Sequence, residues 1–269
     1  MIRSLWTSAS GMHAQQLSID VIANNLANVN TTGFKHSRTN FQDLLYQNLR
    51  EVGSETSQTG TQVPVGVQIG HGVKAAAVGK DFTQGSPVAT SQDPLNTDLM
   101  VLGQGFFQVR LPNGDTAYTR DGSFKIDKDG NMVTADGYPL IGGEIALNPT
   151  THTGISIGAN GSIGLVTNQG GTNITTAGQI ELARFVNPAG LVAVGNNLFK
   201  ESVASGGATT GLPDQDGMGA LKQHYLEQSN VSMVTEMVDM ITTQRAYEMA
   251  SKGIRTADDM MGLVASLKR

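Results

Sequence analysis

The sequence has no cysteine among its 269 residues, which excludes disulfide bonds and thiolate metal sites. This absence also favours a location outside the reducing cytosol. Aromatic residues contribute only 5% and charged residues only 15%, whereas glycine occurs 33 times. A chain of this composition is expected to be rich in turns and β-strands and to bury a modest hydrophobic core.

Basic residues and long apolar runs are scarce as well. The net charge is −5 and no basic stripe is large enough for nucleic acid, so we expect no nucleic-acid binding. No apolar run approaches the roughly 18 residues that span a membrane. Only Arg3 is basic near the start, no apolar run follows it, and Gln15 and Gln16 interrupt the segment. We therefore expect no cleaved secretory signal.

The last forty residues carry an apolar residue at every seventh position. One row consists of Met233, Met240, Tyr247, Ile254 and Met261. A flanking row begins at Met237 and continues through Ala250, Ala257 and Val264. Such a seam predicts a coiled-coil-type helix that needs a partner, on the order of 60 Å long at about 1.5 Å per residue. A long amphipathic helix lying on a core is the alternative.

The first thirty residues carry a matching pattern. The central row consists of Leu5, Met12, Ile19 and Leu26, which Ile22 and Val29 extend on one side and Ile2, Ala9 and Ala23 on the other. Asn28 and the run Thr31-Thr32-Gly33 are expected to end this helix, with Gly33 as its stop. Neither terminal helix can bury its seam alone. We therefore predict that they pair with each other or with copies from neighbouring subunits.

The sequence between the terminal helices is typical of β-structure. Strands are expected near residues 99–102, 106–111, 132–134, 155–157, 163–166, 179–185 and 191–194. Turns are expected at residues 112–115, 128–131 and 135–137, which carry NG or DG dipeptides. Residues 34–49 are predicted to be partly helical, residues 51–62 to form a flexible linker, and residues 202–219 to form a loop.

Together these expectations define an α+β fold. Residues 1–35 and 225–269 would form a helical inner domain with coiled-coil-like pairing. Residues 36–73 would be a connecting segment, and residues 74–224 a β-rich outer domain built as a meander or small barrel.

Catalytic and metal-binding patterns are weak throughout. GISIG at residues 154–158 matches the letters of a nucleophile elbow, but no helix is expected after Ser156 and only His224 follows as a histidine. Residues 127–131 resemble the start of a calcium loop, but Tyr138 stands where the bidentate glutamate belongs, so a hairpin turn is the better interpretation. GQG lacks the third glycine of a dinucleotide site. The histidines lie without ligand spacing at positions His13, His36, His71, His152 and His224. We therefore predict no catalytic, cofactor-binding or metal-binding residues and no enzyme activity.

Three groups of motifs resemble those of the axial proteins of the bacterial flagellum, the rod and hook family. They are ANNLANVNTTGFK at residues 23–35, GQGFF at 103–107 with YTRDGSF at 118–124, and SNV at 229–231 followed by QRAYE at 244–248. The similarity extends over essentially the whole chain. The start MIRSLW, the AQQ at residues 14–16 and the length are most similar to members that form the distal rod.

This resemblance implies a structural subunit whose terminal helices line the inner tube of a hollow helical assembly, with the β-domain outside. The assembly would cross the periplasm as part of the basal body and pass torque from the motor to the hook. Implied partners are further copies of the chain, proximal rod proteins, the hook protein, outer ring proteins, the rod cap and the flagellar type III export apparatus. Gly33 would allow a positive φ where the chain leaves the tube.

The resemblance and the heptad pattern together give the residues expected at subunit interfaces. They are Leu5, Met12, Ile19, Asn24, Asn25, Leu26, Asn28, Gly33, Phe34, Tyr46, Leu49, Met233, Met237, Met240, Gln244, Arg245, Tyr247, Ile254 and Met261. The asparagines Asn24, Asn25 and Asn28 are expected to cap backbone groups or bridge helices. Gln244 and Arg245 are expected to form intersubunit hydrogen bonds or salt bridges. Ordinary helix-end polarity and a solvated helix face are the alternatives.

Residues 46–64 form a stretch that the resemblance marks as an addition relative to the hook protein. We expect it to order between subunits and to stiffen the rod, because its polar side chains can hydrogen-bond across a wet interface. Two other functions stay open at this point. One is another rod or hook protein of the same family, and the other is a secreted β-domain enzyme or binding module with coiled-coil oligomerisation ends.

Overall fold

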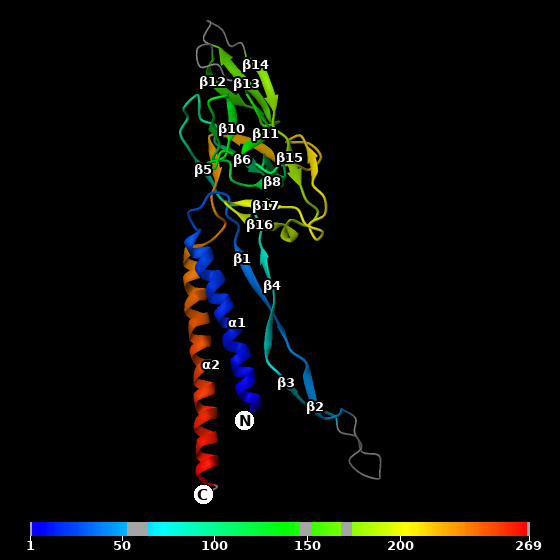
Figure 1. Ribbon diagram of the computed structural model, residues 1–269, viewed down its shortest axis with the longest axis vertical. Coiled ribbons are helices and arrows are strands. Elements are labelled where there is room, and N and C mark those ends of the chain that lie inside the picture. The colour runs from blue at the N-terminus through cyan, green and yellow to red at the C-terminus, as the bar shows by residue number, and fades with distance from the viewer. Residues whose placement is uncertain (1, 53–63, 146–151, 168–173, 268–269) are drawn as a thin grey trace. The chain divides into compact units, whose positions relative to one another are not determined.

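The computed structural model describes residues 2–52, 64–145, 152–167 and 174–267. The chain forms two compact units (Figure 1). Unit 1 consists of Met1–Ala27, Ser37–Lys80 and Ser232–Arg269, and unit 2 of Asn28–His36 and Asp81–Val231. Two terminal helices and a β-rich middle make this an α+β fold, as predicted.

Unit 1 contains both helices, α1 (Ile2–Ala27) and α2 (Met233–Leu267), which lie side by side in Figure 1. Its strands form two antiparallel pairs, β1 (Ser37–Asp43) with β4 (Val73–Lys80) and β2 (Tyr46–Arg50) with β3 (Val67–Gly70). Strands β1 and β4 also contact α1.

The prediction that residues 34–49 are partly helical is wrong, because β1 and β2 occupy most of this segment. A local pattern does not reveal this outcome, since the hydrogen-bonding partner of β1 begins some thirty residues later in the chain, at Val73. The predicted linker at residues 51–62 lies outside the described residues except for its first two positions.

The end of α1 comes earlier than predicted. The helix ends at Ala27, and a turn follows in which the Thr31 amide donates to the Asn28 carbonyl at 3.1 Å. Gly33 belongs to unit 2 and has a φ of 68°. A Cβ on Gly33 would lie 2.6 Å from the Asp121 amide nitrogen, so both the backbone conformation and the close approach require glycine.

Unit 2 is built from antiparallel strands throughout its described part. Its largest sheet has the order β16-β17-β8-β7-β11-β10-β9, and β15 joins β18 to β7. The bounds of these strands are β7 (Phe106–Arg110), β8 (Thr116–Thr119), β9 (Lys125–Ile126), β10 (Asn131–Val133), β11 (Pro139–Glu144), β15 (Leu182–Arg184), β16 (Val192–Gly195), β17 (Leu198–Lys200) and β18 (Thr209–Gly211). A short 3-10 turn, η1 (Pro188–Gly190), precedes β16.

Three smaller sheets complete unit 2. The first has three strands, and each of the others has two. They are β12 (His152–Ile157), β13 (Ser162–Thr167) and β14 (Ile174–Gln179) in that order, β6 (Leu99–Leu102) with β19 (Ala220–Gln223), and β5 (Pro87–Ala89) with β20 (Tyr225–Glu227).

Most of the predicted strands and turns are present. In each of the three predicted turns a glycine amide donates to a carbonyl three residues earlier, and Gly114, Gly130 and Gly137 all have positive φ. The predicted strand at residues 179–185 is instead the end of β14 and the separate strand β15, and β18 lies within the predicted loop at residues 202–219.

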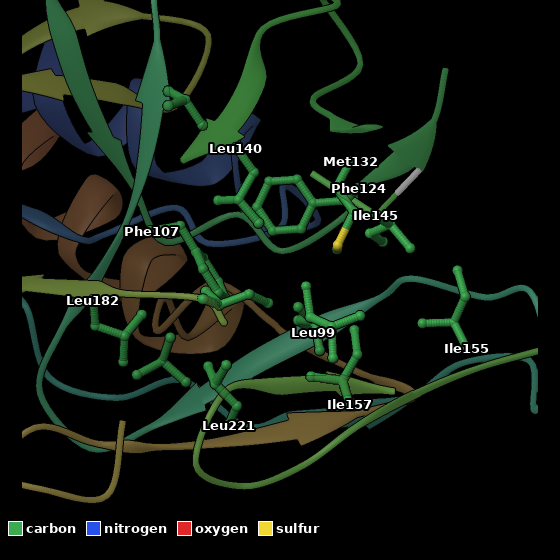
Figure 2. Close-up of a cluster of buried hydrophobic side chains, with 14 of the residues drawn as sticks. Leu99, Phe107, Phe124, Met132, Leu140, Ile145, Ile155, Ile157, Leu182 and Leu221 are labelled. Carbon is green, nitrogen blue, oxygen red and sulfur yellow. The ribbon is translucent and has the colours of Figure 1, made fainter. Parts of the chain in front are cut away.

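The core of unit 2 consists of two clusters on opposite faces of β7. Neighbouring strand residues point to opposite faces, so Phe107 enters one cluster and Phe106 the other. Figure 2 shows the first cluster, where the Phe107 and Phe124 rings meet edge to face with centroids 5.1 Å apart. In the second, Phe106 packs edge to face on Phe185 and Phe199. The double phenylalanine of GQGFF therefore serves both cores.

A buried group of charges joins three distant segments of unit 2. The Lys35 ammonium lies 2.6 Å from Oε1 of Glu227, and Nη1 of Arg120 lies 3.7 Å from Oε2 of the same carboxylate. All three side chains are almost completely buried. Lys35 also donates to the Thr83 carbonyl at 2.7 Å, and the Gly85 amide donates to Glu227 at 2.9 Å.

Burial dominates the electrostatics of this group. It lowers the pKa of the Lys35 ammonium below its usual value, and the attraction of Glu227 opposes that shift. Burial likewise lowers the pKa of the Arg120 guanidinium, again opposed by Glu227. Since two cations share one carboxylate, Glu227 is the residue on which the group depends.

We predict that Glu227→Gln strongly destabilises unit 2, because it leaves two buried cations without their counter-charge. The expected loss is about 3–5 kcal/mol in the free energy of unfolding. Urea unfolding followed by circular dichroism in the aromatic region would measure it. The matched control is Asp115→Asn, because Asp115 is exposed and pairs with Lys200 at 2.7 Å in a solvated surface bridge. Equal midpoints for the two variants would contradict the prediction.

Candidate assembly interface

Asn25 links three elements of unit 1 through its buried amide. Its Nδ2 donates to the Ser37 carbonyl at 2.8 Å and to Oε2 of Glu236 at 3.1 Å, while its Oδ1 accepts from the Ser37 amide at 3.0 Å. The side chain therefore holds the start of β1 and ties α1 to the first turn of α2. Glu236 is itself buried, and its amide donates to the Ser232 carbonyl at 3.0 Å.

The two helices run antiparallel, and small side chains let them approach closely. Asn25 near the end of α1 meets Glu236 near the start of α2. At the other end, a Cβ on Gly253 would lie 3.2 Å from Oγ of Ser8. Ser10 and Ser18 lie toward the strands, where Oγ of Ser10 accepts from the Val73 amide and Oγ of Ser18 accepts from the Thr39 hydroxyl.

The side of α2 that is buried differs in part from the predicted seam. Its buried residues are Glu236, Thr243 and Ala257, and its half-buried apolar residues include Met240, Ala246, Ala250, Ile254 and Met261. These positions follow one another at intervals of three or four residues along the helix. The predicted flanking row begins instead at Met237, which is 50% exposed. Polar residues take the corresponding buried places because they have internal partners: Thr243 donates to the Asp239 carbonyl at 2.6 Å.

The other predicted interface residues fall into groups of different exposure. On α1, Leu5, Met12, Ile19 and Leu26 are half-buried, Asn24 is exposed, and Asn28 follows the helix as a half-buried residue. On α2, the exposed members are Met233, Gln244, Arg245 and Tyr247. Gly33 and Phe34 belong to unit 2, and Tyr46 and Leu49 are more than half exposed on β2. The structure thus brings together only Asn25 and the half-buried rows of the two helices.

Unit 1 exposes many large apolar side chains on its helices and strands. On the helices they are Trp6, Met233, Val234, Met237, Val238, Ile241, Tyr247, Met249, Met260, Leu263, Val264 and Leu267. On and beside the strands they are Phe41, Leu45, Tyr46, Leu49, Val52, Val65, Val67, Ile69 and Val78. Such a surface is typical of a protein that buries it against other protein chains.

Sequence reasoning missed the charged residues that organise both units: Lys35, Arg120, Glu227 and Glu236. Lys35 and Glu227 are 192 residues apart, so no periodic pattern connects them. The available signal is local: Lys35 ends an otherwise uncharged thirteen-residue motif, and Glu236 is the only charge in the first turn of α2. Neither signal identifies the partner.

The described residues contain no group of three or more His, Asp or Glu side chains that could hold a metal ion. Ser156 lies within β12 and pairs with Gly164 of β13, and the strand is followed by a turn and another strand, so Ser156 does not sit on the strand–turn–helix bend of a nucleophile elbow. No described helix combines the length and apolar character that a membrane crossing requires. The exposed apolar side chains of unit 1 remain as the main candidate for a functional surface.

Comparison with known proteins identifies the family. Three family models match in chain order: "Flagella basal body rod protein" at residues 5–35, "Flagellar hook protein FlgE/F/G D1 domain" at 100–165, and "Flagellar basal body rod FlgEFG protein C-terminal" at 222–267. A flagellar basal-body rod protein FlgG of Borreliella burgdorferi is 48% identical over 269 residues and covers 100% of both chains.

A second FlgG, from Caulobacter vibrioides, is 48% identical and covers 99% of this chain and 100% of its own. A hook protein FlgE of Helicobacter mustelae is 43% identical but matches only 53% of this chain and 31% of its own. The full-length match therefore favours the rod protein over the hook protein, as the sequence motifs predicted. The chain belongs to the family of flagellar basal-body rod proteins FlgG, which are structural proteins and not enzymes.

Proposed function

We propose that this chain polymerises into the distal part of the flagellar rod, a hollow helical shaft that carries torque from the motor to the hook. The observation that carries the proposal is the large exposed apolar surface of unit 1. Unit 2, by contrast, buries two complete hydrophobic clusters within itself. A chain in which one unit buries its apolar side chains and the other leaves many of them exposed is suited to assembly through the second unit.

The helical pair is the proposed inner domain. The buried and half-buried positions of α2 alternate by threes and fours, which supports coiled-coil-like pairing with α1. The opposite faces of both helices then stay available for neighbouring copies. Contacts made by many copies in parallel can bear torque without any catalytic group, and a head-to-tail contact that does not close generates a filament.

The same role implies partners beyond further copies of the chain. The proximal rod proteins, the hook protein, the ring proteins around the rod, the rod cap and the flagellar type III export apparatus would each contact the subunit at some stage. The proposed location is the basal body, across the periplasm and toward the outer membrane. Family membership supports this proposal at the level of the rod and hook.

We predict that Ile254→Asp blocks polymerisation while unit 2 stays folded. Ile254 is half-buried on α2, and a carboxylate there would be desolvated against α1 or a neighbouring copy. Electron microscopy at high protein concentration and a motility assay would both report the loss. The control Val203→Asp changes a fully exposed residue of unit 2 and should polymerise normally. Rods of Ile254→Asp, or failure of the control, would contradict the assignment.

We also predict that the terminal helices are stable only in the polymer. In α2 only Glu236, Thr243 and Ala257 are buried, and helices without extensive packing are marginal in water. Hydrogen exchange on dilute monomer should show rapid exchange in α1 and α2 and slow exchange in the strands of unit 2. Strong protection of both helices in the monomer would show that the pair is self-sufficient.

The strand pair β2–β3 is the proposed stiffening element. Nearly all residues of both strands are exposed, and a two-stranded hairpin is marginally stable alone. Tyr46 and Leu49 therefore present apolar side chains that a neighbouring copy can cover. The predicted stiffening stretch at residues 46–64 includes positions 53–63, which lie outside the described residues.

Removing residues 48–62 should still allow polymers, but these should be curved or bendable, because the subunits lose contacts that fix their relative positions. Electron micrographs of polymers made from the shortened chain would show their curvature. Straight, stiff polymers would mean that rigidity comes from other contacts, and a complete loss of polymers would mean that the stretch is needed for assembly itself.

A further inference from the structure

The register of the helical pair shows that α2 extends beyond α1. Seventeen positions separate Ser8 from Asn25 on α1, and seventeen separate Glu236 from Gly253 on α2, so the two helices advance in step between these contacts. Continuing at the same rise, Ile2 lies level with about residue 259 of α2. Residues 260–267 therefore extend past the first residue of α1 and form the overhang, in which only Met261 is half-buried.

The overhang carries an apolar stripe and no charge. Met260, Leu263, Val264 and Leu267 have the spacing i, i+3, i+4 and i+7, and each is between 48% and 86% exposed. This spacing places all four side chains on one face of the helix. None of the eight residues from 260 to 267 is charged.

A second stripe with the same spacing lies at the other end of α2. Val234, Met237, Val238 and Ile241 are each at least half exposed. The neighbouring residues Glu236, Met240 and Thr243 face α1, so this start stripe lies on the side of α2 away from its partner. Both stripes are uncharged helix faces of equal length.

The two stripes of one copy cannot meet each other. Met260 comes nineteen positions after Ile241 in a continuous helix, a distance of about 28 Å at 1.5 Å per residue. Neither stripe can therefore cover the other within one copy. A second copy of this chain carries both stripes, and the overhang of one copy matches the start stripe of another in spacing, apolar character and length.

We propose that the overhang of α2 docks on the start stripe of α2 in the next copy along the rod. This inference rests on the proposed function and names the residues of one contact within it. Because opposite ends of the same helix meet, the contact is head-to-tail and each copy can both give and receive it, which is the condition for an open filament. Helix-on-helix packing of two such stripes is a common mode of recognition between chains.

The absence of cysteine allows a direct test by disulfide trapping. The test variant carries Val238→Cys and Leu263→Cys, and the control carries Asp239→Cys and Leu263→Cys. Asp239 is exposed but lies about 100° around the helix from Val238, outside the stripe. After polymerisation and mild oxidation, the test variant should give a ladder of dimers, trimers and longer products on a non-reducing gel, several-fold more than the control.

The outcomes separate this inference from the proposed function. Polymers without a ladder above the control level would overturn the docking contact and leave the rod function standing. If the unsubstituted chain forms no polymer, the proposed function fails and the docking contact fails with it.

Charge exchange provides a second measurement if the cysteine variants do not polymerise. Val238→Glu and Leu263→Lys should each block assembly alone, because each places one unpaired charge in the contact. The double variant should polymerise again, since the two charges face each other. A double variant no better than either single one would overturn the proposal.

Discussion

A pair of helices can bury only one face of each member, and this limit explains the organisation of the chain. The 35 residues of α2 carry apolar side chains on more than one face, and α1 has only 26 residues to cover them. Intramolecular packing therefore leaves apolar stripes and the end of α2 uncovered. The hydrophobic effect acts on that remainder and favours association with further copies. Helix geometry alone thus supplies a physical reason for assembly.

The second unit solves a different physical problem. Few of its residues are aromatic, and it builds a stable core by sharing them between two clusters. The buried Lys35–Glu227–Arg120 group adds specificity, since it is satisfied only when the segment after α1, the end of β8 and the strand before α2 meet. The segment that follows α1 and the segment that precedes α2 are thus held together within unit 2. Unit 2 thus buries its apolar clusters internally, whereas unit 1 leaves apolar faces of its helices exposed.

Local signals in the sequence were enough to predict the helices and turns. They were insufficient to predict which strands and which charged residues pair with each other. Heptad spacing predicts α1 and α2 because a helix repeats every few residues, and NG and DG dipeptides predict the turns because glycine accepts positive φ. Strand β1 was missed because its partner lies in β4, and the salt bridge of Lys35 was missed because Glu227 lies 192 residues away. The predicted flanking row of α2 begins at Met237, but in the structure Glu236 takes the buried place. Hydrophobicity alone cannot show that Glu236 is buried beside Asn25.

That polar contact has a further consequence for assembly. Apolar heptads alone permit a pair of helices to slip by seven residues with little change in buried surface. A slip of that size would separate Asn25 from Glu236 and break the hydrogen bond between them, while the bonds of Asn25 to Ser37 hold its amide in place on α1. Losing a hydrogen bond to a buried carboxylate is costly, so the polar pair favours one register over the others. The register in turn sets how much of α2 projects past α1. A polar residue near one end of the pair therefore determines the length of the apolar segment at the other end, and with it the surface offered to the next copy.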